Sequence, residues 1–207
     1  NNCQFIGIAT NKGNNARNIA DKYQFNYCTD KSEELFNDKN CNTIFVVTRH
    51  DSHAKYVTEA IKHHKHVFVE KPLCLLESEL DEIAALQKDN QHFVMVGFNR
   101  RFAPLIQKLK TQLIPNQPVA INYRINSGTI AADHWVHDKA IGGGRIIGEV
   151  CHFIDLVSFL SGSKISSISA NEMVNANNLR DTLVINIKLQ NGSIASISYF
   201  SNGSKEL

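Results

Sequence analysis

The stretch Val67-Phe68-Val69-Glu70-Lys71-Pro72-Leu73 decides the fold class. Its Val-Phe-Val run predicts a short buried strand, and the charged pair and the proline mark the end of that strand. Such a strand fits a parallel sheet, and α/β proteins bind ligands at the carboxyl edge of that sheet. Lys71 is therefore a candidate for chemistry. The alternative is that Glu70 and Lys71 form an ordinary solvated pair beyond a strand end.

Strand-like and helix-like segments alternate along the first half of the chain. The strand-like segments are residues 5–10, 43–48, 66–70 and 92–97. Between them, apolar residues recur at helical spacing: Ala16, Ile19, Ala20 and Tyr23, then Ala54, Val57, Ala60 and Ile61, then Leu80, Ile83, Ala84 and Leu86. This alternation predicts an α/β fold with a parallel, doubly wound sheet.

These segments resemble, in order, the nucleotide-binding half of the glucose-fructose oxidoreductase / inositol 2-dehydrogenase (Gfo/Idh/MocA) family. The family's Thr-Pro-Asn-x-x-His stretch corresponds to Thr-Arg-His-Asp-Ser-His at 48–53, and its Glu-Lys-Pro to residues 70–72. The resemblance continues through residues 97–102 and 142–155 and covers essentially the whole chain. It implies an oxidoreductase that uses NAD or NADP. It also implies hydride transfer to or from a secondary alcohol of a sugar, cyclitol or nucleotide sugar.

The chain lacks the G-x-G-x-x-G turn with which a dinucleotide-binding domain opens. The glycines at 142–144 and Gly148 have a different spacing and follow no evident strand, so they predict a loop. Aligned on the family, residues 5–10 correspond to the second strand. We therefore expect an incomplete Rossmann-like sheet whose first strand is missing, with a gap between the second and fourth strands. We also expect the chain to be part of a longer polypeptide.

The pattern changes near residues 97–104, which predicts a nucleotide-binding domain over 1–98 and a second domain over 99–207. A helix over 103–113 is followed by strand-like segments at 119–126, 165–174, 183–189 and 194–200. Asn191-Gly192 is a strong hairpin signal. One long helix, roughly 146–160, interrupts the strands. The arrangement resembles the family's α+β substrate domain with an open, mainly antiparallel sheet, which implies a homo-oligomer formed through that sheet.

Composition limits the possible partners. The chain has 207 residues, 43% hydrophobic content and a net charge of +2, so nothing in its charge favours nucleic acid. No signal peptide or long apolar stretch is visible, so we expect no membrane partner. Five cysteines without a C-x-x-C pair indicate reduced thiols and a cytoplasmic protein.

The long helix carries the second half of the expected site. Glu149, His152 and Asp155 are spaced three apart, which puts them on one helical face. In the inositol dehydrogenase branch the motif is Asp-x-x-x-His, whose histidine is the acid/base and is assisted by the lysine of Glu-Lys-Pro. His152 and Lys71 match these two positions, whereas Gly148 stands at the aspartate position. Glu149 is then the expected source of the carboxylate.

Other positions follow from the resemblance. The expected cofactor contacts are Thr10, Asn11, Thr48, Arg49, His53, Glu70 and Lys71, and the expected substrate contacts are Asn99, Arg100, Arg124, Asn126, Trp135 and Asp155. His53 has an alternative reading as a helix N-terminal residue satisfied by backbone, and Arg124 as a cross-strand charge. The segment 142–155, preceded by Asp-His-Trp at 133–135, resembles a subgroup found in two-domain dehydrogenase-like proteins of surface polysaccharide synthesis.

Two other classes of function stay open. A metal enzyme would use Cys151, His152, Asp155 and one histidine from His50, His53, His63, His64 and His66, although no pair has H-E-x-x-H spacing, so we expect no metal. A catalytically silent binding or assembly fragment would keep the fold without turnover. Gly148 and the missing phosphate turn favour that second class.

Overall fold

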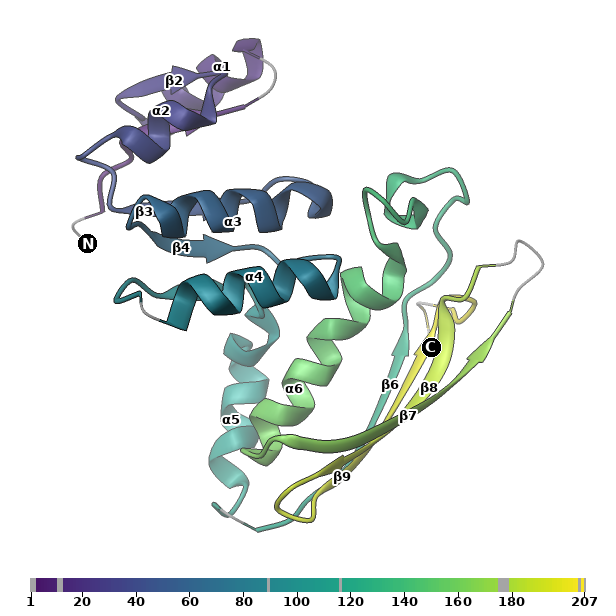
Figure 1. Cartoon of the computed structure of the whole chain (residues 1–207). Helices are drawn as coiled ribbons and strands as arrows, with labels where there is room; N and C mark the ends of the chain where they lie inside the picture. Colours follow the sequence, from purple (N-terminus) through teal and green to yellow (C-terminus); the bar gives the residue numbers. More distant parts are fainter. Residues whose placement is uncertain are drawn as a thin grey trace. The chain divides into compact units, whose positions relative to one another are not determined.

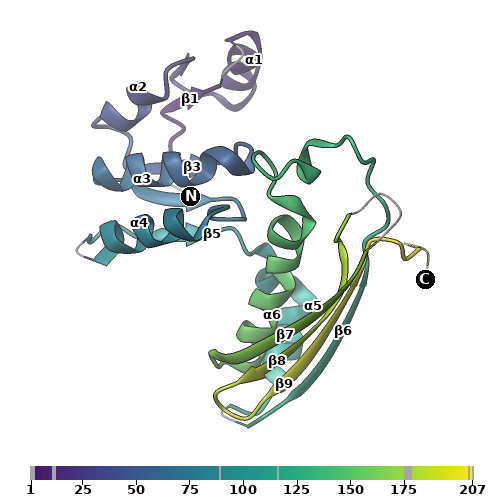
Figure 2. The ribbon, with the colours of Figure 1, turned by 45° about the vertical axis from the view of Figure 1, so that its right-hand side comes forward.

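The computed structural model describes residues 3–10, 13–88, 90–115, 117–174, 179–204 and 206, with backbone only for 13–15. The chain divides into two compact units (Figures 1 and 2). The first comprises Asn1–Thr48 and Ser52–Gly97, and the second Arg49–Asp51 and Phe98–Leu207. In the described part of the chain, no helix has the length and apolar character needed to cross a membrane.

The first unit alternates strands and helices. Its elements are β1 (Gly7–Ala9), α1 (Gly13–Tyr23), β2 (Tyr27–Thr29), α2 (Ser32–Asn37), β3 (Thr43–Val46), η1 (His50–Ser52), α3 (His53–Lys62), β4 (His66–Val69), α4 (Glu77–Lys88) and β5 (Val94–Val96). All its strand pairs are parallel, β1 with β2, β3 with β4 and β4 with β5. The expected parallel α/β architecture is confirmed, with strands shorter than the apolar runs that predicted them.

The parallel sheet of this unit is in two pieces. β1 and β2 form a two-stranded sheet, and β3, β4 and β5 form a three-stranded one. Within the described ranges no ladder joins β1 to β3, so each presents an edge. The break lies where a gap was expected, between the segments 5–10 and 43–48. Phe45 on β3 is 66% exposed, as a strand with an uncovered face allows.

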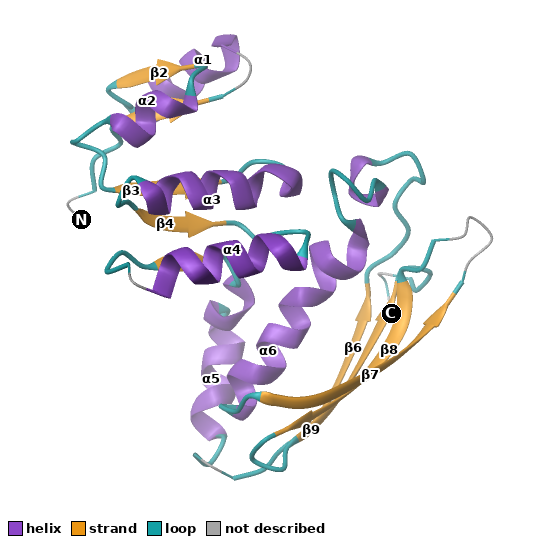
Figure 3. Cartoon of the chain, viewed as in Figure 1, coloured by secondary structure: helices purple, strands orange, loops and turns teal. Residues whose placement is uncertain are grey.

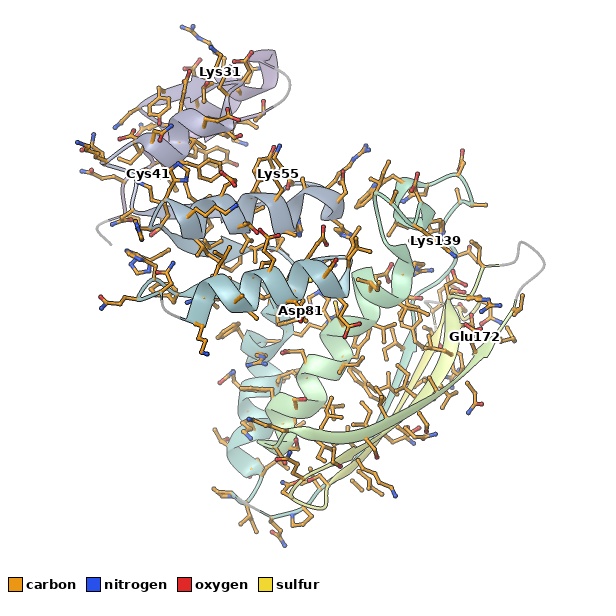
Figure 4. All side chains as sticks on the ribbon, viewed as in Figure 1. Lys31, Cys41, Lys55, Asp81, Lys139 and Glu172 are labelled. Carbon is orange, nitrogen blue, oxygen red and sulfur yellow. The ribbon has the colours of Figure 1, made fainter. Side chains whose placement is uncertain are left out.

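The core of the first unit surrounds α3 and β4. Val57 and Ala60 of α3 and Val67 and Val69 of β4 have no exposed surface. Full burial of a valine side chain stabilises a fold by about 1.5–3 kcal/mol. A buried polar contact of Lys65 lies at one side of this core. The Lys65 ammonium donates to the backbone carbonyls of Asp38 and Cys41, at 2.7 and 2.6 Å (Cys41 is labelled in Figure 4).

The second unit is an α+β domain. Its elements are η2 (Asn99–Phe102), α5 (Pro104–Gln112), β6 (Ala120–Asn126), η3 (Trp135–His137), η4 (Ile146–Val150), α6 (Cys151–Ser161), β7 (Ile165–Met173), β8 (Thr182–Leu189) and β9 (Ile194–Phe200). The sheet order is β6-β9-β8-β7. β7 and β9 run antiparallel to β8, and β6 runs parallel to β9. The predicted open, mainly antiparallel sheet is confirmed.

Helix α6 covers one face of this sheet (Figure 3). Val150, Phe153 and Val157 pack against inward-facing residues of β8 and β9, among them Ile197 and Tyr199. The turn between β8 and β9 contains Gly192 at φ 87°, as the Asn-Gly hairpin signal predicts. On the other face Ile168 and Ile194 are each 54% exposed. The sheet therefore has one face in the core and one open face.

The helix predicted over 146–160 has two parts. The turn Ile146–Val150, η4, is π-helical, and the α-helix begins only at Cys151. It ends at Ser161, and the next residue, Gly162, has the left-handed φ of 66° that glycine adopts readily at this position. The π-helical turn changes which side chains lie above one another, so the α-helical spacing that grouped Glu149 with His152 does not hold across Val150.

Candidate functional site

Lys71 follows β4 at the carboxyl end of the three-stranded sheet. The backbone N–H groups of Glu70 and Gly97 continue the ladders there, donating to Val46 and Val69 at 2.9 and 2.8 Å. The Lys71–Pro72 peptide is cis, and the Lys71 side chain is half-buried. A Cβ on Gly97 would lie 3.2 Å from Oε2 of Glu70, so the glycine leaves room for that carboxylate. Lys71 therefore occupies the edge at which parallel sheets bind ligands.

His53 fixes the loop that carries Lys71. Its Nδ1 lies 2.6 Å from the carbonyl oxygen of Pro72, and its Nε2 lies 3.0 Å from that of Thr48. The ring has no exposed surface. The two ring nitrogens thus lie within hydrogen-bond distance of backbone carbonyls at the ends of both β3 and β4. This arrangement favours the reading in which His53 is satisfied by backbone, and it makes His53 an organiser of the loop.

The other expected cofactor residues fall in three places. Thr48 follows β3, and its hydroxyl accepts a hydrogen bond from Ser52 Oγ at 2.7 Å. Thr10 follows β1, and its backbone N–H donates to the carbonyl of Thr29 at 3.2 Å. Arg49 belongs to the second unit, whereas Asn11 lies outside the described residues. Thr48, Glu70 and Lys71 thus share one sheet edge, while Thr10 follows a strand of the other sheet.

His152 lies in the first turn of α6 in the second unit and is 8% exposed. The Phe98 ring meets the imidazole edge to face, with centroids 6.1 Å apart and an interplanar angle of 75°. Both residues belong to the same unit. The aromatic contact fixes the plane of the imidazole.

Glu149 points into a buried polar network. Arg145, 2% exposed, donates to both of its carboxylate oxygens, at 2.8 and 3.1 Å, and the Tyr199 hydroxyl donates to Oε2. Burial raises the pKa of Tyr199, and the hydrogen bond to the Glu149 carboxylate raises it further. The carboxylate expected to assist His152 therefore has strong partners on the side of the sheet. We read it as holding the π-helical turn against β9.

Asp155 is anchored to the turn η2. The Arg101 guanidinium donates to both Asp155 oxygens, and the Nε to Oδ2 distance is 2.6 Å. The Asp155 side chain is 8% exposed. This hydrogen bond is the main cause of a raised pKa of Arg101. Glu149, His152 and Asp155, which were expected to form one polar face, thus each have a different set of partners. The sequence argument overlooked Arg101, the partner of Asp155.

The expected substrate residues lie at several places in the second unit. Asn99 and Arg100 are exposed in η2, and the Arg100 guanidinium lies 4.7 Å from the Phe153 ring centroid. Arg124 lies over Phe200 of the neighbouring strand at 5.7 Å, as the cross-strand reading expects. Asn126 ends β6, and Trp135 opens η3.

Trp135 is the centre of a cluster that sequence reasoning missed. The Arg49 guanidinium lies 5.4 Å from its ring centroid, and the His50 imidazole meets the ring edge at 4.9 Å. His50 Nδ1 lies 2.8 Å from the carbonyl oxygen of Gly142. The only signals in the sequence were two departures from the family pattern, His50 in place of an asparagine and Gly148 in place of an aspartate. Within the described ranges, no group of three His, Cys, Asp or Glu side chains is placed to hold a metal ion.

Two family models match the chain, one per domain. Residues 1–98 match the model described as oxidoreductase family, NAD-binding Rossmann fold, and residues 117–206 match the GFO/IDH/MocA C-terminal domain. The chain belongs to the Gfo/Idh/MocA oxidoreductase family. The family description names NAD, which agrees with the expected cofactor class.

Relatives in this family are oxidoreductases by name. The chain is 28% identical over 200 residues to "Uncharacterized oxidoreductase YrbE" of Bacillus subtilis, covering 86% of this chain and 54% of the relative. It is 26% identical over 183 residues to "Myo-inositol 2-dehydrogenase" of Thermotoga maritima, covering 79% and 51%. The chain therefore spans about half the length of the curated relatives it matches.

Solved structures share the fold. A levoglucosan dehydrogenase in complex with NADH and levoglucosan has a TM-score of 0.86 at 21% identity, covering 98% of this chain and 59% of that one. A probable dehydrogenase from Thermotoga maritima has a TM-score of 0.83 at 23% identity, covering 96% and 62%. At these identities the likeness supports the Gfo/Idh/MocA fold alone.

Proposed function

We propose that this chain supplies the nicotinamide-binding and substrate domains of an NAD(P)-dependent dehydrogenase. The substrate is a secondary alcohol of a sugar, cyclitol or nucleotide sugar. The observation that carries the proposal is the position of Lys71, directly after a central parallel strand, on a loop fixed by the buried His53. The names of the relatives, a myo-inositol dehydrogenase among them, support the reaction class.

The residues at the sheet edge fit a dinucleotide in part. Thr48, Glu70 and Lys71 gather at the carboxyl ends of parallel strands, where such ligands bind, and Thr10 would add a contact after β1. When bound, the nicotinamide would accept or supply the hydride. NAD and NADP remain alternatives in this proposal.

His152 and Lys71 carry the proton chemistry in this proposal. Oxidation of a secondary alcohol moves a hydride from carbon and a proton from oxygen, and His152 takes that proton as general base. The Lys71 ammonium stabilises the developing alkoxide. Glu149 and Asp155 have structural roles in this proposal. Glu149 holds the π-helical turn, and Asp155 joins α6 to η2. Asn99, Arg100, Asn126 and Trp135 are proposed to bind the substrate.

Four further statements belong to this proposal. The first is a division into a domain over 1–98 and a domain over 99–207. The second is a homo-oligomer formed through the open face of the β6–β9 sheet, where Ile168 and Ile194 are exposed. The third is a cytoplasmic location. The fourth is membership of the surface-polysaccharide subgroup, which rests on the wording of residues 133–135 and 142–155.

The competing proposal is a catalytically silent fragment, and the split sheet is the observation that favours it. Measurements of NADH binding and of turnover distinguish the two proposals. We expect NADH fluorescence titration to show binding by the chain, and myo-inositol with NAD⁺ or NADP⁺ to give turnover. Lys71→Ala and His152→Ala are each expected to abolish that turnover, while His152→Ala keeps NADH binding. Absence of NADH binding by the folded chain would instead establish the silent fragment.

A further inference from the structure

Helix α5 exposes most of its apolar surface. Leu105 is 80% exposed and Leu109 is 46% exposed. The two leucines are four residues apart, so they lie one above the other on the same face of the helix. None of the nine residues of α5 is buried, whereas a surface helix of a globular protein normally buries an apolar stripe. The face that carries Leu105 and Leu109 is therefore a candidate contact surface.

The other side of α5 is held against α6, beside which it runs (Figures 1 and 2). The Lys110 ammonium donates to the carbonyl oxygen of Leu160 at 2.9 Å. It also lies 5.6 Å from the Phe159 ring centroid, and the Arg101 guanidinium of η2 lies 5.5 Å from the same centroid. Lys110 lies about 140° around the helix from Leu105. The contacts with α6 therefore leave Leu105 on the outward side of α5.

The charge around the two leucines is of one sign. Lys108 is exposed and lies three residues after Leu105, which makes the two side chains neighbours on the helix surface. Arg100, in η2, is exposed as well. From residue 90 to residue 132 the chain has five Lys and Arg residues and no Asp or Glu. This surface is therefore complementary to an anionic partner that can also accept leucine side chains.

Helix α4 offers a comparison within the same chain. Leu76 and Leu80 are also four residues apart, and they are 61% and 46% exposed. The charged residues beside them are acidic: Glu77, Glu79, Asp81 and Glu82. Exposed leucines at this spacing thus occur twice, once beside cations and once beside carboxylates. Only the pair on α5 has the charge that suits an anionic partner.

We propose that α5 docks on the surface of a lipid bilayer that contains anionic lipid. Leu105 and Leu109 insert among the headgroups, and Lys108 and Arg100 lie at the level of the lipid phosphates. Two copies of this basic face repel each other, which disfavours association of the chain with itself through α5. The contact is peripheral and needs no helix that spans the membrane. It is independent of the proposed dehydrogenase function.

The test is cosedimentation of the chain with vesicles made of equal parts of phosphatidylglycerol and phosphatidylcholine. We expect wild type to bind these vesicles, to bind less as salt is added, and not to bind vesicles of phosphatidylcholine alone. Lys108→Gln should weaken binding about fivefold, the equivalent of about 1 kcal/mol for one cation at the surface. Leu105→Asn combined with Leu109→Asn should weaken it more than about tenfold, because each inserted methylene group contributes to binding.

Leu76→Asn combined with Leu80→Asn is the matched control, since it removes two leucines of the same spacing, and it should bind like wild type. Lys88→Gln removes an exposed cation from α4 and is the control for charge. Circular dichroism checks that each variant is folded. If the double change at 105 and 109 prevents folding, Leu105→Ala replaces it, because that side chain has few contacts to lose.

Three results would overturn the inference. They are failure of wild type to bind the anionic vesicles, unchanged binding after the double change in α5, and an equal loss after the double change at 76 and 80. A dimer seen by light scattering and broken by Leu105→Asn would assign α5 to a second copy of the chain and overturn it too. NADH binding and turnover are measured separately, so none of these results decides the dehydrogenase proposal.

Discussion

Removal of the Arg101 side chain is the sharpest structural test of the second unit. Asp155 is nearly buried, with 8% of its side chain exposed, and Arg101 donates to both carboxylate oxygens. Breaking a buried ion pair from one side costs about 3–5 kcal/mol. The Arg101 side chain is 38% exposed, so water screens the pair. We therefore expect Arg101→Gln to lower the free energy of unfolding by about 2 kcal/mol, near the value for a charged hydrogen bond.

The assay is urea denaturation followed by circular dichroism, with the slope m compared between variants. Lys108→Gln is the control, because Lys108 is exposed on α5 and its substitution removes the same charge. Asp155→Asn should destabilise the unit by a similar amount, whereas Arg101→Leu with Asp155→Leu together should cost less than either single change. A loss for Arg101→Gln within about 0.5 kcal/mol of the Lys108→Gln control would refute the anchoring role and return Asp155 to the substrate contacts.

Three further changes test other contacts. Tyr199→Phe should destabilise the second unit by about 1–3 kcal/mol in urea, because the partly buried Glu149 carboxylate loses a donor, and an unchanged midpoint would contradict the network. Burial, and then the hydrogen bond to Asp38, raise the pKa of Tyr27 from 10.0 to about 12. Its stabilising contribution is therefore complete below pH 10 and lost as the pH rises towards 12, so Tyr27→Phe should flatten the alkaline fall in stability measured by urea titration. Gly7→Ala should lower Tm, since its Cβ would lie 2.5 Å from Cζ of Tyr27, and a Tm equal to wild type would refute that contact.

Local patterns predicted most of the fold. The apolar runs around Val67 and Val94 became parallel strands, and Asn191-Gly192 became a hairpin turn, because strand burial and turn geometry depend on neighbouring residues. The position of Lys71 at a sheet edge followed from the same reasoning. The π-helical turn η4 could not be predicted from the sequence. It is only five residues long, and over so short a segment the spacing of apolar residues does not distinguish a π-helix from an α-helix.

The partners of the site residues could be identified only from the three-dimensional structure. Helical periodicity predicts which side chains are neighbours on one helix, but it does not predict which residues from other parts of the chain contact them. Arg101 reaches Asp155 across 54 positions, Tyr199 reaches Glu149 across 50, and His50 reaches Gly142 across 92. Each of these contacts satisfies a polar group that would be costly to bury alone.

The same reasoning applies to Gly148. Its missing carboxylate favoured a silent fragment, although Glu149, one residue on, was expected to supply a carboxylate from the same turn. In the structure the glycine and His50 share one space, so the loss of one polar group from the helix coincides with the arrival of another from the β3–α3 connection. An absent side chain is informative only together with whatever fills its volume, since close-packed interiors leave few voids. The departure at 148 therefore argues for a different arrangement of polar groups at this turn, which does not by itself imply a lost activity.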